Sequence, residues 1–532
     1  MPPRHPFRLL SRLGLAAGAL VASAAAGALL AQGRAPGGGL VLFNQVRAIV
    51  ADRYVDATSD STLFEAAARG LVEGLDDPYA ELVAPKDLQA FSVEAYGKYG
   101  GVGLLVEDHD GATLVRRVYP NTPAERAGVR QGDRIVAVGD SSTAGWKFGD
   151  VTKALKGPPG TAVRATFRRE AVPEPITVTL TRAVIHVPSV PYAMMLDGGV
   201  GYVPLQQFSE TATAEVSEAM LRLERQGARS FVLDLRGNGG GIMDQALATS
   251  SLFLPERSLV ARVEYRSSAP ESLVTTGAPL SPSVPLAVLV DGGSASAAEI
   301  VAGALQDHDR ALVVGATSFG KGLVQGVFRL DGGYMLKLTT GRWYTPSGRS
   351  IHLPRTLVAG RFVMDSTAEA LAADTLHRPV FRSDAGRRLF GGGAITPDVL
   401  VAGDTLTDLE RRVATAIAPK AQAVYLQLYD FVKARKPQLS QTFAVTPAWR
   451  DEVYRRMQGV GVALPRPVYD SAQGYMDRLI GEQVSRLAFG DSAAVRRFAG
   501  EDAQLQRALA ALRGAGSQEE VFAAAGRGKP AG

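Results

Sequence analysis

The sequence of 532 residues predicts an α/β protein with a mainly β module and with helical regions near both ends. Continuous apolar runs of strand length, such as "SFVLDLR" at 230–236, alternate with amphipathic helical patterns in the central part. Glycine-punctuated, β-branched runs fill residues 96–182. Helical periodicity dominates residues 40–95 and the chain after about residue 404. This length exceeds that of one ordinary domain.

The expected elements follow one another in a clear order. The segment "LFEAAARGLVEGL" places Leu63, Ala66, Ala67 and Leu71 on one stripe of a helix. The later elements are strands at 134–138, 162–167 and 176–180, a strand in 199–208, a helix over 213–227, strands at 230–236 and 285–290, and a helix after 296.

The composition excludes several classes of function. Hydrophobic residues make up 46% of the chain and charged residues 21%, which is usual for a globular protein. The net charge is only +5, and no long basic tract is present, so we expect no nucleic-acid partner. The chain has no cysteine, and no two of its 6 histidines have metal-ligand spacing. We therefore expect no metal site and no cofactor.

The N-terminal segment predicts export. Arg4, Arg8 and Arg12 precede an uncharged apolar run at 13–31, which is typical of a secretory signal or of an uncleaved membrane anchor. The alternative is a buried alanine-rich helix. Cleavage is left open, because no small-residue cleavage site is well placed. The following "APGGG" at 35–39 is expected to be a flexible linker.

The segment "GATSFGKG" raises the possibility of a phosphate-binding loop. Gly315, Gly320 and Lys321 fit its G-x-x-x-x-G-K pattern, but Gly322 stands where the magnesium-binding hydroxyl belongs. The next residues predict a strand instead of the required helix, so an NTPase is disfavoured. A lysine can instead act as general base toward a serine when burial lowers its pKa. On a strand, Gln325 would share a face with Lys321 and could orient its amine.

A candidate serine lies in "VDGGSASAAEIVAGALQD" at 290–307, where a buried strand enters a small-residue turn and then a helix. The helix N-terminus favours a developing oxyanion through its dipole and its free amides. Ser296 and Glu299 also fit a capping box, and Ser294 is a plausible cap. The local sequence therefore leaves both a capping and a catalytic role open.

The glycine-rich segment "FVLDLRGNGGGIMDQAL" at 231–247 joins a strand to a helix. Backbone N–H groups in such a turn can converge on an anion. The alternatives are a plain tight turn or a dinucleotide-binding loop, but Ile242 stands where the last glycine of the dinucleotide fingerprint belongs.

The chain resembles the C-terminal processing peptidases, also called tail-specific proteases, over roughly residues 45–350 and 391–401. This resemblance implies an α/β, crotonase-like Ser-Lys peptidase core. It is carried by motifs in the family's order: "GLDDPYAEL" (74–82), "LDLRGNGGG" (233–241), "SASAAEIVAGALQD" (294–307), "GATSFGKGLVQ" (315–325) and "LTTGRWYTPSGRSI" (338–351).

The resemblance assigns the catalytic roles. It implies that Ser296, the second serine of S-A-S-A, is the nucleophile, that Lys321 is the general base and that Gln325 orients the lysine. We expect an exported serine endopeptidase that cleaves near protein C-termini. A non-catalytic scaffold that only binds C-terminal peptides is the alternative.

The resemblance also implies an oxyanion hole. The amide of Ala297 and an amide of the glycine-rich turn, for which we choose Gly237, would form it. Two departures from the family pattern are Gly239 in place of a proline and Ala298 in place of a serine. Neither removes a group that the mechanism needs, but the first leaves the choice of amide in the turn open.

Residues 96–182 resemble a PDZ domain. The loop residues Gly101, Val102, Gly103 and Leu104 match the segment whose backbone captures a chain end while the peptide adds as a β-strand. The alternative is a small β domain without a ligand. The partners implied are proteins or peptides with apolar C-terminal tails.

The resemblance places the protein in the bacterial periplasm or cell envelope, with membrane anchoring by 13–31 left open. We also expect a homo-oligomer and consider an adaptor or activator protein. The expected organisation is a signal or anchor with linker at 1–36, an N-terminal helical region at 37–95, a PDZ domain at 96–182, a peptidase core at 183–403 with an insertion at 353–393, and a C-terminal helical region at 404–532.

Overall fold

The computed structural model describes residues 38–88, 91–92, 96–109, 112–169, 172–358, 361–363, 378–403 and 406–527. The expected signal or anchor at 13–31 lies outside these residues. In the described ranges no helix is long and apolar enough to span a membrane, and no group of three or more acidic or histidine side chains could hold a metal ion. The chain divides into two compact units, Met1–Leu82 and Val83–Gly532.

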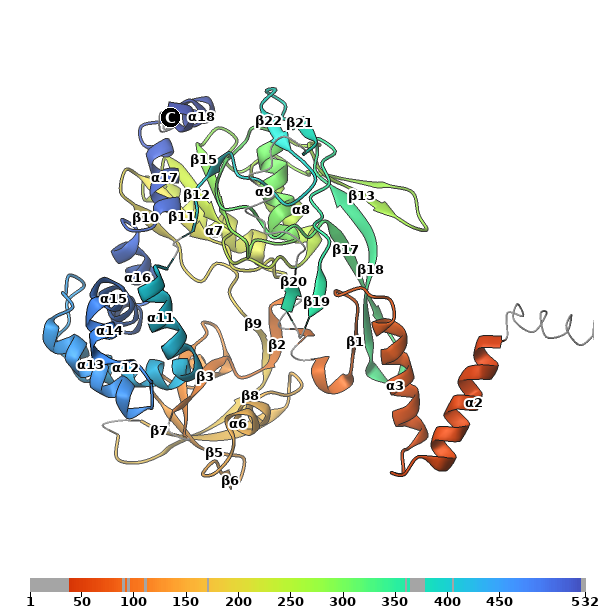
Figure 1. The fold of residues 1–532 in the computed structure, drawn as a ribbon. Coiled ribbons are helices and arrows are strands. Elements are labelled where there is room, and N and C mark those ends of the chain that lie inside the picture. Colours follow the sequence, from red (N-terminus) through yellow and green to blue (C-terminus); the bar gives the residue numbers. More distant parts are fainter. Residues whose placement is uncertain are drawn as a thin grey trace, which may run out of the picture. The chain divides into compact units, whose positions relative to one another are not determined.

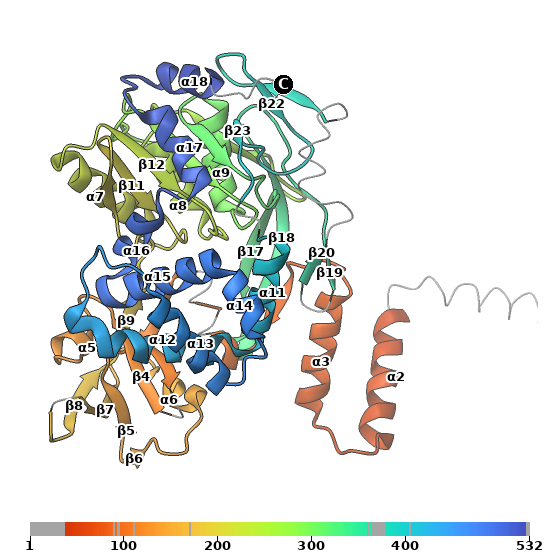
Figure 2. The same ribbon diagram turned by 60° about the vertical axis from the view of Figure 1, so that its left-hand side comes forward.

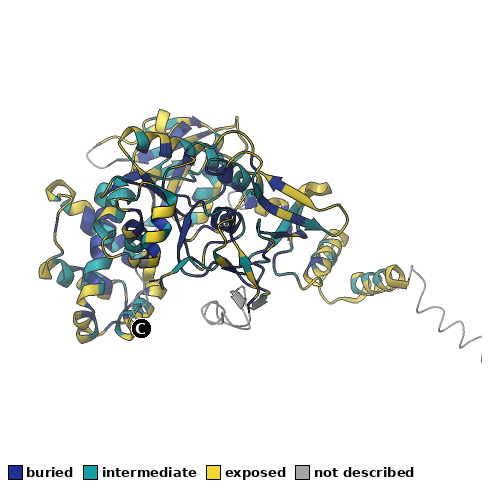
Figure 3. Cartoon of the chain, turned by 90° about the horizontal axis from the view of Figure 1, so that it is seen from above, coloured by how far each residue is buried: buried dark blue, intermediate teal, exposed yellow. Residues whose placement is uncertain are grey.

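The first unit contains helices α2 (Gly38–Arg53) and α3 (Asp60–Glu73). Ser59 caps α3, because its side chain accepts a hydrogen bond from the Thr62 N–H. No residue of the apolar stripe predicted for this helix is buried: Leu71 is 72% exposed, and Val72 is the one buried residue in the two helices. Exposed residues accordingly dominate both helices (Figure 3).

The second unit is built around a six-stranded sheet with the order β10-β11-β12-β15-β16-β23 (Figure 1). Strand β10 is antiparallel to β11, and all other neighbours are parallel. The central strands are buried along their whole length, as their continuous apolar runs predict. The strands are β10 (Met194–Leu196), β11 (Val200–Pro204), β12 (Ser230–Asp234), β15 (Leu286–Val290), β16 (Leu312–Gly315) and β23 (Val399–Leu400).

Helices cover both faces of this sheet (Figures 1 and 2). One face packs against α7 (Ala212–Arg225), α8 (Met243–Ser251) and α9 (Ala297–Asp307). Alternate strand residues point to the other face, where α17 (Ala503–Leu512) and α18 (Gln518–Arg527) pack. Helices α17 and α18 are therefore an integral layer of the core.

An antiparallel sheet next to this core includes β13, β14, β17 and β18; β13 pairs with β14, and β18 pairs with both β13 and β17. Strands β17 and β18 bring Gln325 and Trp343 to the site described below. The elements of this part are β13 (Leu259–Tyr265), β14 (Glu271–Val274), β17 (Leu323–Arg329), η2 (Asp331–Gly333) and β18 (Met335–Tyr344). The insertion predicted at 353–393 carries the small hairpins β19 (Thr356–Val358) with β20 (Arg361–Val363) and β21 (Val380–Arg382) with β22 (Arg388–Phe390).

The mainly β module has a sheet of order β3-β4-β5-β7-β8 with its own apolar core, and the strands predicted in it are confirmed. Strand β2 pairs with β9 where the chain enters and leaves the module. The elements of the module are β2 (Lys98–Gly101), β3 (Leu104–His109), β4 (Ala112–Val118), α5 (Pro123–Arg126), β5 (Arg134–Val138), β6 (Ser141–Ser142), α6 (Phe148–Leu155), β7 (Ala162–Arg168), β8 (Ile176–Thr181) and β9 (Ala183–His186).

The helices of residues 408–498 form a bundle, and those up to residue 489 share a separate hydrophobic core. The bundle contacts the β module: Arg117 forms an ion pair with Asp491, and the Arg116 guanidinium lies 4.8 Å from the centre of the Tyr425 ring. The helices are α11 (Asp408–Ile417), η3 (Ala418–Lys420), α12 (Ala421–Arg435), η4 (Lys436–Gln438), α13 (Pro447–Gly459), α14 (Arg466–Ser471), α15 (Gln473–Phe489) and α16 (Asp491–Phe498).

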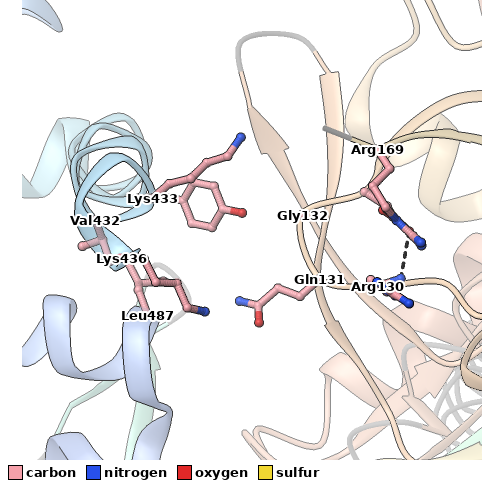
Figure 4. Close-up of a pocket in the computed structure, with 10 residues that line it drawn as sticks. Arg130, Gln131, Gly132, Arg169, Val432, Lys433, Lys436 and Leu487 are labelled. Carbon is pink, nitrogen blue, oxygen red and sulfur yellow. Dashed lines mark hydrogen bonds and ion pairs between the residues drawn. The ribbon is translucent and has the colours of Figure 1, made fainter. Parts of the chain in front are cut away.

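A cavity of about 400 Å³ lies where the β module and this bundle meet (Figure 4). Arg130, Gln131 and Arg169 line it from the module, and Lys433 and Lys436 line it from the bundle. None of the predicted catalytic residues lies in it.

Candidate active site

Ser296 lies at a sharp turn between a buried strand and a buried helix. Strand β15 ends at Val290, and α9 begins at Ala297. The Ser296 backbone has φ +55° and ψ −113°, a conformation that residues with a Cβ rarely adopt. Such backbone strain costs about 1–3 kcal/mol and persists only where the surrounding contacts enforce it. The turn therefore holds Ser296 in a fixed, strained position.

The neighbouring Ser294 has a structural role. Its side chain is fully buried; the hydroxyl donates to the Leu235 carbonyl at 2.7 Å and accepts from the Asp291 N–H at 2.9 Å. Ser296, and not Ser294, lines a cavity. The geometry thus separates the two candidate serines, which the local sequence alone did not.

Lys321 and Gln325 are hydrogen-bonded partners, as predicted. The Lys321 Nζ donates to the Gln325 Oε1 at 2.7 Å. The lysine lies between β16 and β17, so a strand follows it and not the helix that a phosphate-binding loop requires. The Trp343 indole N–H donates to the Lys321 carbonyl at 3.1 Å and helps to fix its backbone.

The Glu299 carboxylate joins the two halves of the site. Its side chain is buried, and it accepts the N–H groups of Ser296 at 2.8 Å and Lys321 at 2.9 Å. It also accepts the Ser318 hydroxyl and the Gly320 N–H, each at 2.6 Å. Burial raises the pKa of Glu299, while these four donors act in the opposite direction. The bond from the Ser296 N–H to the Glu299 carboxylate is one half of the predicted capping box, whereas the Ser296 side chain makes no cap hydrogen bond. The same carboxylate also holds the segment that carries the lysine.

The glycine-rich turn requires a correction at Gly237. Its N–H donates to the Asp291 Oδ1 at 2.8 Å, and the residue does not line the cavity. The physical reason is that Asp291, just after β15, supplies an internal acceptor for this amide. Gly239 and Gly241 do line the cavity. Ala297 lines it as well, at the first position of α9, where a helix leaves its N–H without an intrahelical acceptor.

Asn238 fastens the glycine-rich turn to the serine turn. Its buried side chain donates to the Leu205 carbonyl at 2.7 Å and accepts the Gly240 N–H at 2.8 Å. Its own carbonyl accepts the Ala295 N–H at 2.9 Å. A Cβ at Gly240 would lie 2.9 Å from the Ser296 Cβ, so this close approach requires glycine.

The cavity that joins these groups has a volume of about 380 Å³. Ser296, Lys321 and Gln325 share it with the exposed turn residue Gly239. Most of its remaining wall is apolar and comprises Phe91, Tyr96, Ile242, Met243, Ile300, Leu323, Val324, Val327 and Trp343. The arrangement can hold an apolar side chain next to a hydroxyl, an amine and backbone N–H groups.

Comparisons with known proteins match two regions of this chain to protein families. Residues 199–356 match the model of Peptidase family S41, and residues 114–169 match that of a PDZ domain. The chain is 35% identical to the carboxy-terminal processing protease CtpA of Bacillus subtilis over 299 residues, which are 56% of this chain and 64% of that relative. It is 34% identical to the carboxy-terminal-processing protease of Bartonella bacilliformis over 316 residues, 59% of this chain and 72% of the relative. The chain belongs to the carboxy-terminal processing protease family.

This family consists of serine-type peptidases. The predicted fold class, a protease core of mixed α/β structure with a PDZ domain and a helical C-terminal region, is confirmed. Among solved structures, the photosystem II D1 C-terminal processing protease shares 26% identity; the match covers 68% of this chain and 92% of that one, with a TM-score of 0.35.

The PDZ domain of this family member has its predicted loop between β2 and β3. Gly101 ends β2, Val102 is buried, and Leu104 begins β3. Gly103 has φ +88°, and a Cβ there would lie 2.2 Å from the Thr122 Cβ, so this position requires glycine.

A small groove runs beside this loop. Residues of β2, the loop and β3 form one side of it, and Thr152, Leu155 and Lys156 at helix α6 form the other. The sequence reasoning missed this second side, although the amphipathic pattern of α6 signals its existence. It also missed Trp343 and the second role of Glu299, because both depend on contacts between distant segments.

We predict that Glu299→Gln lowers the free energy of unfolding by about 1–3 kcal/mol, because the amide presents a donor toward groups that are themselves donors. The change should appear in urea unfolding followed by circular dichroism. Glu218→Gln, at an exposed position of α7, is the matched control and should change little. Equal stability of the two variants would contradict the role given to Glu299.

Proposed function

We propose that this protein is an exported serine endopeptidase that binds protein C-termini through its PDZ domain and cleaves near them with a Ser-Lys dyad. The observation that carries the proposal is the shared cavity, in which a strained Ser296, the Lys321–Gln325 pair and the glycine-rich turn meet. Family membership supports the reaction type.

In the proposed reaction the Ser296 oxygen attacks the scissile carbonyl carbon. The neutral Lys321 amine takes the proton from the Ser296 hydroxyl at the same time. The N–H groups of Gly239 and Ala297 stabilise the oxyanion. The peptide C–N bond then breaks, and the lysine returns the proton to the leaving amine. Water, deprotonated by the same lysine, attacks the acyl-enzyme, and the proton returns to the serine as the acyl group leaves. Gln325 orients the amine throughout.

The apolar cavity wall and the PDZ groove define the proposed substrates. Ile242, Met243 and Ile300 offer an apolar pocket next to the serine, which favours apolar residues near the cleaved bond. The PDZ groove supports capture of an apolar C-terminal tail as an added strand. A loosely folded protein with such a tail therefore suits both sites.

We predict that the chain from residue 37 onward cleaves a loosely folded protein with an apolar C-terminal tail, and that Ser296→Ala and Lys321→Ala each lower the rate by more than about 10³-fold. Mass spectrometry of the products measures cleavage and its position. Ser217→Ala on α7 and the exposed Lys86→Ala are matched controls and should cleave like the wild type.

The outcomes separate the proposal from its alternatives. Equal cleavage by both site variants would identify a contaminant and refute the dyad. Tail binding by every variant without cleavage by any would support the non-catalytic scaffold, or a protease that requires an adaptor or activator.

We predict that Thr152→Phe weakens binding of an apolar C-terminal peptide by about tenfold or more, because the ring fills a groove with little free volume. Thr179→Phe, at an exposed position of β8, is the matched control. Fluorescence anisotropy with a free-acid peptide and its amidated form measures binding. Unchanged affinity in Thr152→Phe would place the peptide elsewhere.

The N-terminal part of the chain supports two further proposals. The apolar run at 13–31 directs export to the periplasm or cell envelope, with or without continued anchoring, which fractionation of expressing cells tests. The exposed apolar side chains of α2, including Leu40, Leu42 and Ile49, support a homo-oligomer, which light scattering of the purified chain tests.

A further inference from the structure

The C-terminal region is hydrogen-bonded to an arginine at the start of the glycine-rich turn. Arg236 directly precedes Gly237, and its Nη1 donates to the Asp502 Oδ1 at 3.0 Å and to the Gln504 Oε1 at 3.2 Å. Its Nη2 lies 2.8 Å from the Asp502 Oδ2. Asp502 is 266 positions further along the chain, in the part that carries none of the peptidase motifs.

The other side of the same guanidinium is bound to the core sheet. The Arg236 Nη2 donates to the Asp234 Oδ2 at 2.7 Å, and the backbone N–H of Arg236 donates to the Oδ1 at 3.0 Å. The Tyr202 hydroxyl donates to the same carboxylate at 2.6 Å. Arg236 therefore bridges the end of β12 and the C-terminal region through charge-assisted hydrogen bonds, which are stronger than neutral ones.

The C-terminal acceptors are themselves rigidly held. Asp502 caps α17, since its side chain accepts the Leu505 N–H at 3.0 Å. Gln504 is buried, and its amide donates to the Val401 carbonyl at 3.0 Å. Helix α17 packs Leu505 and Leu509 against the sheet. Further hydrogen bonds thus tie both acceptors to the core layer.

Small displacements of this turn have large chemical consequences. An oxyanion donor must lie about 2.7–3.1 Å from the developing charge, and loss of one donor lowers the rate by about 10²–10³-fold. Asp291 holds the Gly237 amide, and the C-terminal region holds the preceding residue. Both contacts set the position of Gly239, two residues further on.

We infer that Asp502 and Gln504 are positioning residues for the peptidase reaction, and that through Arg236 they fix the turn that presents the Gly239 amide to the oxyanion. The C-terminal region thereby takes part in transition-state stabilisation without contacting substrate. This inference rests on the proposed function.

The test uses the same chain and substrate with Asp502→Asn and Gln504→Leu. Asparagine keeps the cap of α17 but removes the charge that faces Arg236, and leucine removes the second acceptor at similar size. Glu501→Gln, at the exposed neighbouring position, is the matched control. A fluorophosphonate titration of the active serine gives the concentration of folded sites, so kcat is expressed per active site.

We predict that kcat falls about tenfold in Asp502→Asn while KM and the affinity of the PDZ domain for a C-terminal peptide stay unchanged, because only transition-state binding weakens. Gln504→Leu should change kcat in the same direction. Glu501→Gln should match the wild type.

The inference is overturned if kcat per titrated active site in Asp502→Asn equals that of Glu501→Gln. In that case the substitution would lower only the number of folded active sites, as a purely structural role predicts. It is also overturned if KM rises while kcat is unchanged. Failure of the proposed function is distinguishable, because the wild type itself would then leave the substrate uncleaved.

Discussion

The arrangement of the site depends on one buried carboxylate. Glu299 accepts four hydrogen bonds: one from the Ser296 N–H at the serine turn, and three from the segment that carries the lysine, donated by the Ser318 hydroxyl and by the N–H groups of Gly320 and Lys321. Burial of a carboxylate costs free energy unless hydrogen-bond donors surround it. The segments that supply these donors are therefore held in one favourable arrangement around Glu299. The strained serine and the lysine therefore hold a fixed relation although they lie in two separate segments, one after β15 and one after β16.

The glycine-rich turn completes the site under a second constraint, which is close packing of backbones. Gly240 lies so near Ser296 that a side chain would not fit, and Asn238 hydrogen-bonds to both turns. Gly239 and Gly241 of this turn line the cavity beside Ser296. The charged residues Asp291 and Arg236 hydrogen-bond at the start of the turn and do not line the cavity.

The helical C-terminal region has two structural roles. Its last helices, α17 and α18, cover one face of the core sheet, and the bundle before them contacts the PDZ domain. Helix α16 connects these parts: Asp491 at its start pairs with Arg117 of the PDZ domain, and Asp502 shortly after its end pairs with Arg236. The module proposed to bind the substrate tail and the turn proposed to bind the oxyanion are thus attached to the same short segment.

The sequence by itself determined the fold class, the PDZ domain and the identity of Ser296, Lys321 and Gln325 as candidates, because apolar periodicity and ordered motifs are local properties of the chain. Only the tertiary structure showed that Ser294 is internally hydrogen-bonded while Ser296 lines the cavity, that Asp291 binds the Gly237 N–H, and that Glu299 has a second role. It also showed that α17 is part of the core. Each of these depends on hydrogen bonds or packing between segments far apart in sequence, for which no local pattern exists.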